Sequence, residues 1–281
     1  MKLGEWIHAL LYSRAISNFD ENGVPERAFI EDIESLPEEA KHFFVPYWWA
    51  SHQILNKSVL DTGCGMGSAT YYFSKFTARI TGIDVSKISI EFASMRYHSG
   101  NLNFRAMDVL HLDYPDSSFD VVTSFELIEH LNAENQIRYL LEVRRVLKEG
   151  GVLLFSTPNK NLTPGNNSYH LHEVDYEELN GLLSGIFSGV AILGVNKKSE
   201  ILEDVTDCPI LIGRAMKGDP CKYPESMGNY SHDTRSLSTP DALTKEELGF
   251  LISEIGKCSC INCLRIVKKL RQQQEQQEQP E

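Results

Sequence analysis

Short apolar runs alternate with segments of helical periodicity from residue 57 onward. The runs are rich in branched and aromatic residues and predict strands at 57–63, 79–85, 103–109, 119–125, 151–158, 189–195 and 208–216. The intervening patterns predict helices at 68–76, 86–98, 133–147 and 175–187, the third ending at "KEGG". This alternation is typical of a doubly wound α/β fold, in which helices cover both faces of a mostly parallel sheet.

The two ends of the chain differ from this middle part. Residues 1–54 include "HFFVPYWWASH", and we expect a helical lead-in over the open end of the sheet, with its aromatics in the core rather than stacked on a ligand. Residues 218–281 read as a polar loop, a helix at 244–256 and a terminal helix that fades into a glutamine-rich tail. The pattern thus predicts a main domain over 55–217, and the C-terminal helices leave room for a protein partner or self-association.

Composition and charge narrow the class of protein. The 281 residues are 42% hydrophobic and 23% charged, which is typical of a globular chain. Its 39 acidic and 27 basic residues give a net charge of -12, which disfavours a broad nucleic-acid-binding surface. The N-terminus is a poor secretory signal, and no apolar run approaches the ~18 residues that span a bilayer. We therefore expect a cytoplasmic protein without a membrane span.

Six cysteines are too sparse for a disulfide scaffold, so reduced thiols are expected. Cys258, Cys260 and Cys263 lie close together, and Cys208 and Cys221 could add thiolates for a zinc ion. Paired CxxC motifs are missing from this set, which favours cysteines that pack as small apolar residues.

A glycine-rich turn follows the first strand, in "VLDTGCGMGSAT". Gly63, Gly65 and Gly67 allow a ligand to approach the backbone closely, and Asp61 precedes them. In the dinucleotide motif GxGxxG the third glycine would fall at position 68, which is Ser68 here. The spacing therefore disfavours a nicotinamide-dependent oxidoreductase.

Two more aspartates end the next strands, Asp84 in "RITGIDV" and Asp108 in "NFRAMDV". Ligands of open α/β sheets bind outside the carboxyl ends of the strands, where Asp84 could accept two ribose hydroxyls and Asp108 lies near the place of an adenine. Each aspartate alone also fits a loop or helix-capping role. Their joint placement with Asp61 favours a nucleoside.

Together, "VLDTGCGMGSAT", "TGIDVS", "AMDV", "FDVVTSFELIEHL", "EVRRVLKEGGVLLFSTPN" and "YHLHEVDYEEL" resemble the class I S-adenosylmethionine-dependent methyltransferases, nearest to the branch of ubiquinone-type and glycan- or natural-product-associated O-methyltransferases. The resemblance implies a seven-stranded sheet, all parallel except the last strand. It also implies that the three glycines approach the methionine part of S-adenosylmethionine, that Asp84 holds the ribose and that Asp108 with Val109 reads the adenine. Val85 and Phe125 complete the implied cofactor set.

The segment "ELIEH" carries candidate chemistry for the acceptor. Glu126, Glu129 and His130 stand at i, i+3 and i+4, so in a helical turn they share one face and could bind Mg, Mn or Zn. His170 or His172 could add a ligand. The arrangement resembles the metal site of plant small-RNA 2′-O-methyltransferases. Alternatively His130 acts as a general base or only packs, with Glu126 beside the methionine part of the cofactor.

The sequence thus predicts a methyltransferase that acts on a hydroxyl of a small molecule of the sugar, quinone or natural-product type. Two alternatives stay open. One is a catalytically silent S-adenosylmethionine-binding subunit of a complex. The other is an RNA 2′-O-methyltransferase, which the net charge disfavours.

Overall fold

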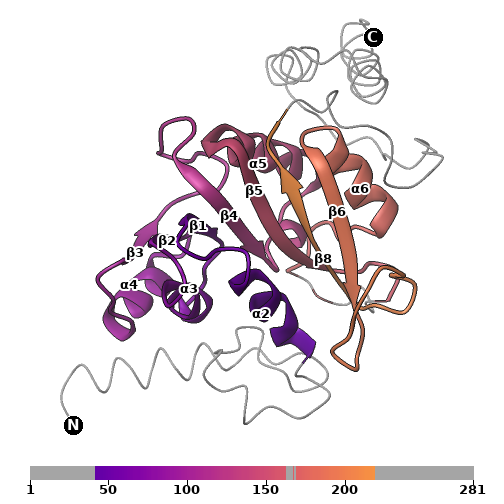
Figure 1. Cartoon of the computed structure of the whole chain (residues 1–281), viewed down its shortest axis with the longest axis horizontal. Coiled ribbons are helices and arrows are strands. Elements are labelled where there is room, and N and C mark those ends of the chain that lie inside the picture. Colours follow the sequence, from indigo (N-terminus) through magenta and orange to yellow (C-terminus); the bar gives the residue numbers. More distant parts are fainter. Residues whose placement is uncertain (1–41, 163–166, 168, 219–281) are drawn as a thin grey trace, which may run out of the picture.

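The computed structural model describes residues 42–162, 167 and 169–218, and its centre is one mixed sheet (Figure 1). The strand order is β3-β2-β1-β4-β5-β8-β6-β7. The strands are β1 Ser58–Thr62, β2 Arg79–Asp84, β3 Leu102–Ala106, β4 Phe119–Phe125, β5 Leu147–Pro158, β6 Ser188–Val195, β7 Ile201–Leu202 and β8 Ile210–Met216. The expected seven strands are all present, and the eighth, β7, is a two-residue edge strand too short to leave a period-2 pattern.

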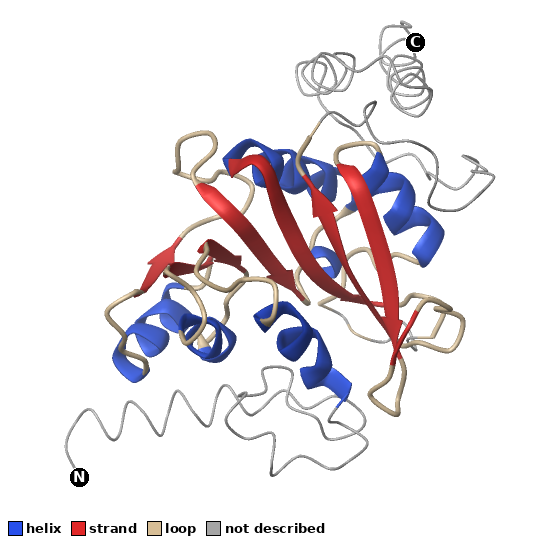
Figure 2. Cartoon of the chain, in the orientation of Figure 1, coloured by secondary structure: helices blue, strands red, loops and turns tan. Residues whose placement is uncertain are grey.

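The helices lie on both sides of this sheet, as the alternating pattern predicts (Figure 2). The α-helices are α2 Val45–Ser51, α3 Ser68–Ser74, α4 Lys87–Arg96, α5 Ala133–Val146 and α6 Tyr176–Ser184, and η3 Ile128–His130 is a short 3-10 turn. In Figure 1, α2, α3 and α4 lie on one side, and α5 and α6 lie on the other. No helix in the described part of the chain is long and apolar enough to cross a bilayer.

Neighbouring residues of the central strands face opposite layers, which explains their continuous apolar runs. Val59 and Val121 pack with Phe73 of α3 and Ala50 of α2. The adjacent Leu60 and Val122 pack in a larger core with α5 and α6, around Tyr139, Leu140 and Leu179. Successive side chains of a strand point to opposite faces, so a strand that is buried on both must be apolar throughout.

The sheet topology places the site. β1 pairs in parallel with β2 on one side and with β4 on the other, and β3 and β5 extend the parallel part. β8 runs antiparallel between β5 and β6. The order reverses between β1 and β4, and ligands of such sheets bind outside the strand ends at this switch point.

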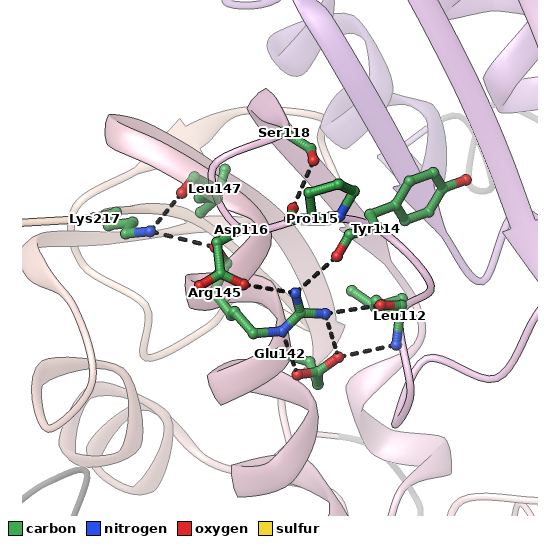
Figure 3. Close-up of polar contacts among 9 residues, drawn as sticks. All are labelled: Leu112, Tyr114, Pro115, Asp116, Ser118, Glu142, Arg145, Leu147 and Lys217. Atoms are coloured by element: carbon green, nitrogen blue, oxygen red, sulfur yellow. Dashed lines mark hydrogen bonds and ion pairs between the residues drawn. The ribbon is translucent and has the colours of Figure 1, made fainter.

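At the other ends of the strands, Arg145 near the end of α5 fixes the loop that leads into β4 (Figure 3). Its guanidinium donates to the carbonyls of Leu112 and Tyr114, each at 2.7 Å, and pairs with Glu142 and Asp116. The expected helix at 133–147 matches α5 within one residue, but "KEGG" belongs to β5, where Gly150 takes a φ of +72°. The lysine and glycines that look like a helix end serve an irregular start of the strand.

Several predictions lie outside the described residues: the lead-in before residue 42, the C-terminal helices, and all cysteines except Cys64 and Cys208. Those two are free and buried, as expected for packing residues. The domain boundaries at 54 and 217 stay predictions. Within 42–54, α2 packs its aromatic side chains onto the sheet face that α3 also covers.

Candidate active site

The glycine turn has the backbone shape that its sequence requires. Gly63, Gly65 and Gly67 have φ values of +68°, +52° and +85°, in the left-handed region that side chains rarely adopt. A Cβ on Gly67 would lie 2.7 Å from Ala93 and Phe104, whereas a Cβ on Gly65 would meet nothing within 4 Å. Gly67 is therefore needed for packing, and Gly65 borders an open space.

Asp61, at the end region of β1, is buried but fully hydrogen-bonded. Its carboxylate accepts from the hydroxyls of Thr70 and Thr123, each at 2.6 Å. Burial raises its pKa from 3.8 to about 6, although the two hydroxyls oppose the rise. Asp61 thus ties α3 and β4 to the turn, and its side chain is only 3% exposed.

Asp84 and Asp108 take the strand-end places that the pattern predicts. Asp84 accepts from the backbone N–H of Gly65 at 2.9 Å and of Ser86 at 2.8 Å, which joins the end of β2 to the turn. Asp108 lies two residues past the end of β3 and accepts from the N–H of Leu110. Each carboxylate oxygen has two acceptor positions, so both groups keep capacity for ligand donors.

The apolar members of the implied cofactor set divide into two kinds. The Val85 side chain is 74% exposed directly after Asp84, which suits a surface that stacks on a base. Val109 and Phe125 are buried in the two cores, so only their backbones can reach a ligand. With the open space at Gly65 and the acceptor at Asp84, the residues fit the nucleoside and sulfonium of S-adenosylmethionine.

The segment after β4 is bent rather than evenly helical. Glu126 has a φ of +49°, an unusual conformation for a side-chain-bearing residue, and its carboxylate accepts from Ser156 at 2.6 Å. Only Ile128–His130 form a 3-10 turn. Consequently Glu126 does not join Glu129 and His130, and the three-residue face expected from "ELIEH" is replaced by another grouping.

That grouping joins Glu129 and His130 to His170, whose candidate ligand atoms all lie within 4.8 Å of one another. The N–H groups of Leu171 and His172 donate to the carbonyl of Glu129, which pins the two segments together. His172 itself pairs with Glu178 at 2.6 Å and is not a member of the group.

Hydrogen bonds fix the ring orientation and the tautomer of His130 and His170. Nδ1 of His130 lies 3.1 Å from the carbonyl of Tyr169, and Nδ1 of His170 pairs with Glu173. A carbonyl or carboxylate partner requires a proton on Nδ1, so each neutral ring carries its lone pair on Nε2. The amide of Asn167 donates to Nε2 of His170 at 2.9 Å, which agrees with this tautomer, so a cation bound at this nitrogen would displace the Asn167 amide.

Glu129 is the member of the group whose hydrogen bonds are not all satisfied. One oxygen accepts from Thr157 at 3.0 Å, while Oε1 is buried without a hydrogen-bond partner among the described residues. Burial, followed by the neighbouring Glu126, raises the pKa of Glu129 well above its ordinary value. A cation beside Oε1 would remove this penalty, because it favours the charged carboxylate.

Gln136 of α5 is a site residue that the sequence analysis missed. It is buried, and its amide donates to the carbonyls of Ile128 at 2.9 Å, Leu131 at 3.3 Å and His172 at 2.8 Å. One side chain therefore holds both segments of the candidate metal group. Its signal is a polar residue on the apolar stripe that Tyr139, Leu140 and Val143 continue.

The comparisons agree with this geometry. The family model described as a methyltransferase domain matches residues 60–155, from β1 to the middle of β5. A probable S-adenosylmethionine-dependent methyltransferase of Mycolicibacterium smegmatis is 27% identical over 220 residues, which cover 67% of this chain and 83% of that protein.

Two further relatives differ in coverage. A ubiquinone biosynthesis O-methyltransferase of Coxiella burnetii is 35% identical over 107 residues, or 37% of this chain and 45% of that protein. The N-methyltransferase NodS of Bradyrhizobium japonicum, solved with S-adenosyl-L-homocysteine, has a TM-score of 0.53 and 18% identity over 75% of this chain and 98% of that one. The chain thus contains a methyltransferase domain over residues 60–155, is similar to S-adenosylmethionine-dependent methyltransferases over two thirds of its length, and has the class I methyltransferase fold.

Proposed function

We propose that the enzyme methylates a hydroxyl group of a small-molecule acceptor with the help of a divalent cation bound by Glu129, His130 and His170. The observation that carries the proposal is the convergence of these side chains around a buried carboxylate oxygen that has no protein partner. One carboxylate and two imidazoles suit Mn, Fe or Zn better than Mg, which prefers oxygen ligands. The pairing of His170 with Glu173 is the arrangement that commonly orients a metal-ligating histidine.

A hydroxyl acceptor suits the chemistry of a cation bound by Glu129, His130 and His170. A hydroxyl is a poor nucleophile until it loses its proton, and a bound cation lowers the pKa of an oxygen that it contacts. The chain's own residues then have two tasks, to hold the acceptor in line with the transferable methyl and to exclude water. Support for oxygen as the acceptor atom also comes from the ubiquinone biosynthesis O-methyltransferase relative.

His130 supports a second mechanism without a metal. The hydrogen bond from Nδ1 to the carbonyl of Tyr169 holds the ring so that Nε2 can take the acceptor proton. Under this alternative, Glu129 stays protonated, in agreement with its raised pKa. The two mechanisms use the same histidine and differ in their response to chelation.

A screen for S-adenosylhomocysteine formation tests both the acceptor and the metal. Phenolic, sugar, amine and RNA acceptors are offered to metal-stripped enzyme in EDTA and to enzyme resupplied with Mn, Zn or Mg. We expect turnover of a phenolic or sugar hydroxyl that EDTA abolishes and one of the metals restores. Full turnover in EDTA would reject the cation and leave His130 as the base, and turnover of amine or RNA alone would reject the acceptor class.

A further inference from the structure

His170 belongs to a short segment, residues 169–173, that is far from Glu129 and His130 in the sequence. Its imidazole meets that of His130 edge to face, with the ring centroids 5.0 Å apart. One direct tie between the segments is the N–H of Leu171, which donates to the carbonyl of Glu129 at 2.9 Å. Because a metal ion requires its ligand atoms at closely defined distances, residues 169–173 must be placed more firmly than a surface loop usually is.

Gln136 of α5 holds this segment from one side. Its side chain is 2% exposed, and its amide donates to the carbonyl of His172 at 2.8 Å and to that of Ile128 at 2.9 Å. The first carbonyl lies two residues after His170, and the second lies directly before Glu129. Since α5 packs in the main core, one amide on a fixed helix sets the separation of the two segments that carry the candidate ligands.

The ring of His172 holds the segment from the other side. Its Nε2 pairs with Glu178 of α6 at 2.6 Å, and only 20% and 12% of the two side chains are exposed. α6 begins shortly after the segment, where the Asp175 side chain accepts from the N–H of Glu178 and Val174 is buried in the core. The residue whose carbonyl contacts Gln136 is therefore also held through its imidazole.

The candidate cation group takes its ligand atoms from other residues, so Gln136 and His172 contribute none. Their contacts fix the backbone next to His170, and metal-ligating histidines generally depend on such neighbouring contacts for their orientation. We propose that Gln136 and His172 are positioning residues that hold His170 where a divalent cation can bind it together with the other two ligands. The inference rests on the cation site proposed above, and it gives His172 a role other than ligation.

Calorimetry on the metal-stripped full-length chain, titrated separately with Mn and with Zn, tests this role without an acceptor. His172→Phe keeps an aromatic ring and removes the contact with Glu178, whereas Gln136→Met keeps the length of the side chain and removes the amide. We expect each variant to bind the metal roughly 10-fold to 100-fold more weakly. S-adenosylhomocysteine should bind as it does to the wild type, because the glycine turn and Asp84 are untouched.

A double-mutant cycle separates positioning from a general loss of packing. Glu178→Leu breaks the same contact from the side of α6, so it should weaken metal binding as much as His172→Phe does. The two changes together should add nothing further, because both remove one interaction. His172 and Glu178 are not fully buried, so these two variants test the proposal on folded protein whether or not Gln136→Met folds.

Tyr139→Phe is the matched control on the same helix. It removes a buried hydrogen bond of 2.6 Å to Thr62 of β1, and it should lower the free energy of unfolding in urea without weakening Mn or Zn binding. Unchanged metal affinity in His172→Phe and Glu178→Leu, or an equal loss in Tyr139→Phe, would overturn the positioning role and leave the cation site standing. A wild type that binds neither metal would overturn both.

Discussion

The cofactor side and the acceptor side of the active site are built in different ways. At the ends of β1 and β2, both oxygens of Asp61 and both oxygens of Asp84 have hydrogen-bond donors within the protein. Beyond β4, Glu129 is buried with one oxygen satisfied and the other without a partner among the described residues. The first half is complete as folded, whereas the second half leaves one buried carboxylate oxygen without a donor from the described residues.

This difference indicates what each half is for. An orphaned buried polar atom costs the fold about 1–3 kcal/mol, and a cation held together with His130 and His170 would offset that cost at Glu129. A complete set of hydrogen bonds instead fixes the shape of a cradle before the ligand arrives, which reduces the entropy lost on binding. Substitutions on the two sides should therefore have separable effects, on chemistry after β4 and on stability or cofactor affinity around the turn.

Glu129→Gln should give the largest effect and should be confined to the acceptor side. The substitution keeps the shape and removes the charge that would hold a cation beside Oε1, so turnover should fall by about 100-fold or more. S-adenosylhomocysteine affinity should change little, because the turn and Asp84 are untouched. Steady-state kinetics at several metal concentrations and calorimetry measure the two quantities.

Glu149→Gln is the control, because Glu149 is exposed near the other end of β5. It should behave like the wild type in both measurements. Equal turnover of Glu129→Gln and wild type would show that the orphaned oxygen has no part in the reaction, and the contrast between the two halves would lose its functional meaning.

Gly67→Ala and Gly65→Ala should separate folding from cofactor binding within the turn. At Gly67 the new methyl group meets Ala93 and Phe104 at 2.7 Å, and with the positive φ we expect a loss of about 2–4 kcal/mol in the free energy of unfolding. At Gly65 there is space, so only the φ penalty of about 1 kcal/mol applies. Urea unfolding gives both values.

For cofactor affinity the order should be reversed: among folded variants, Gly65→Ala should lose more affinity than Gly67→Ala. A methyl group at Gly65 occupies the open space beside Asp84, so S-adenosylhomocysteine should bind about 10-fold more weakly or worse. If Gly65→Ala binds it normally, that space does not belong to the cofactor site, and the cradle must be sought elsewhere along the strand ends.

The cofactor side could be predicted well from the sequence because its signals are local. Strand ends of a parallel sheet share one edge, so Asp61, Asp84 and the glycines could be placed without coordinates. The acceptor side depends on contacts between distant segments. The segments of His170 and Glu129 are joined by the N–H groups of Leu171 and His172, which donate to the Glu129 carbonyl, and by Gln136, which no spacing rule links to either segment.

Two local misreadings have physical causes as well. "KEGG" has the residues of a helix end, yet pairing of Leu147 with Phe119 starts β5 at once, because a sheet partner outweighs a weak local preference. "ELIEH" has helical spacing, but Glu126 takes a left-handed conformation, which its hydrogen bond to Ser156 accompanies. The spacing of "ELIEH" therefore predicted the short helical turn but not the direction in which the Glu126 carboxylate points.

The pH dependence of stability should report on Asp61, whose completed hydrogen bonds do not cancel the cost of burial. Its folded pKa of about 6 lies above the ordinary 3.8, so the native state binds the proton more tightly than the unfolded state. The stability that it contributes is present below pH 4 and is lost as the pH rises through 6. Between pH 4.5 and 7 this carboxyl group should lower the free energy of unfolding by about 2 kcal/mol.

Asp61→Asn removes this dependence while its amide can accept from one of the Thr70 and Thr123 hydroxyls and donate to the other, because hydroxyls can rotate. The unfolding free energies of variant and wild type, measured in urea at pH 4.5 and 7, should converge or cross as the pH rises. Burial also raises the pKa values of Glu126 and Glu129, but both groups are present in either protein and cancel in the difference. Parallel pH profiles would mean that Asp61 is ionised in the native state across this range, and that the two threonine hydroxyls fully compensate for its burial.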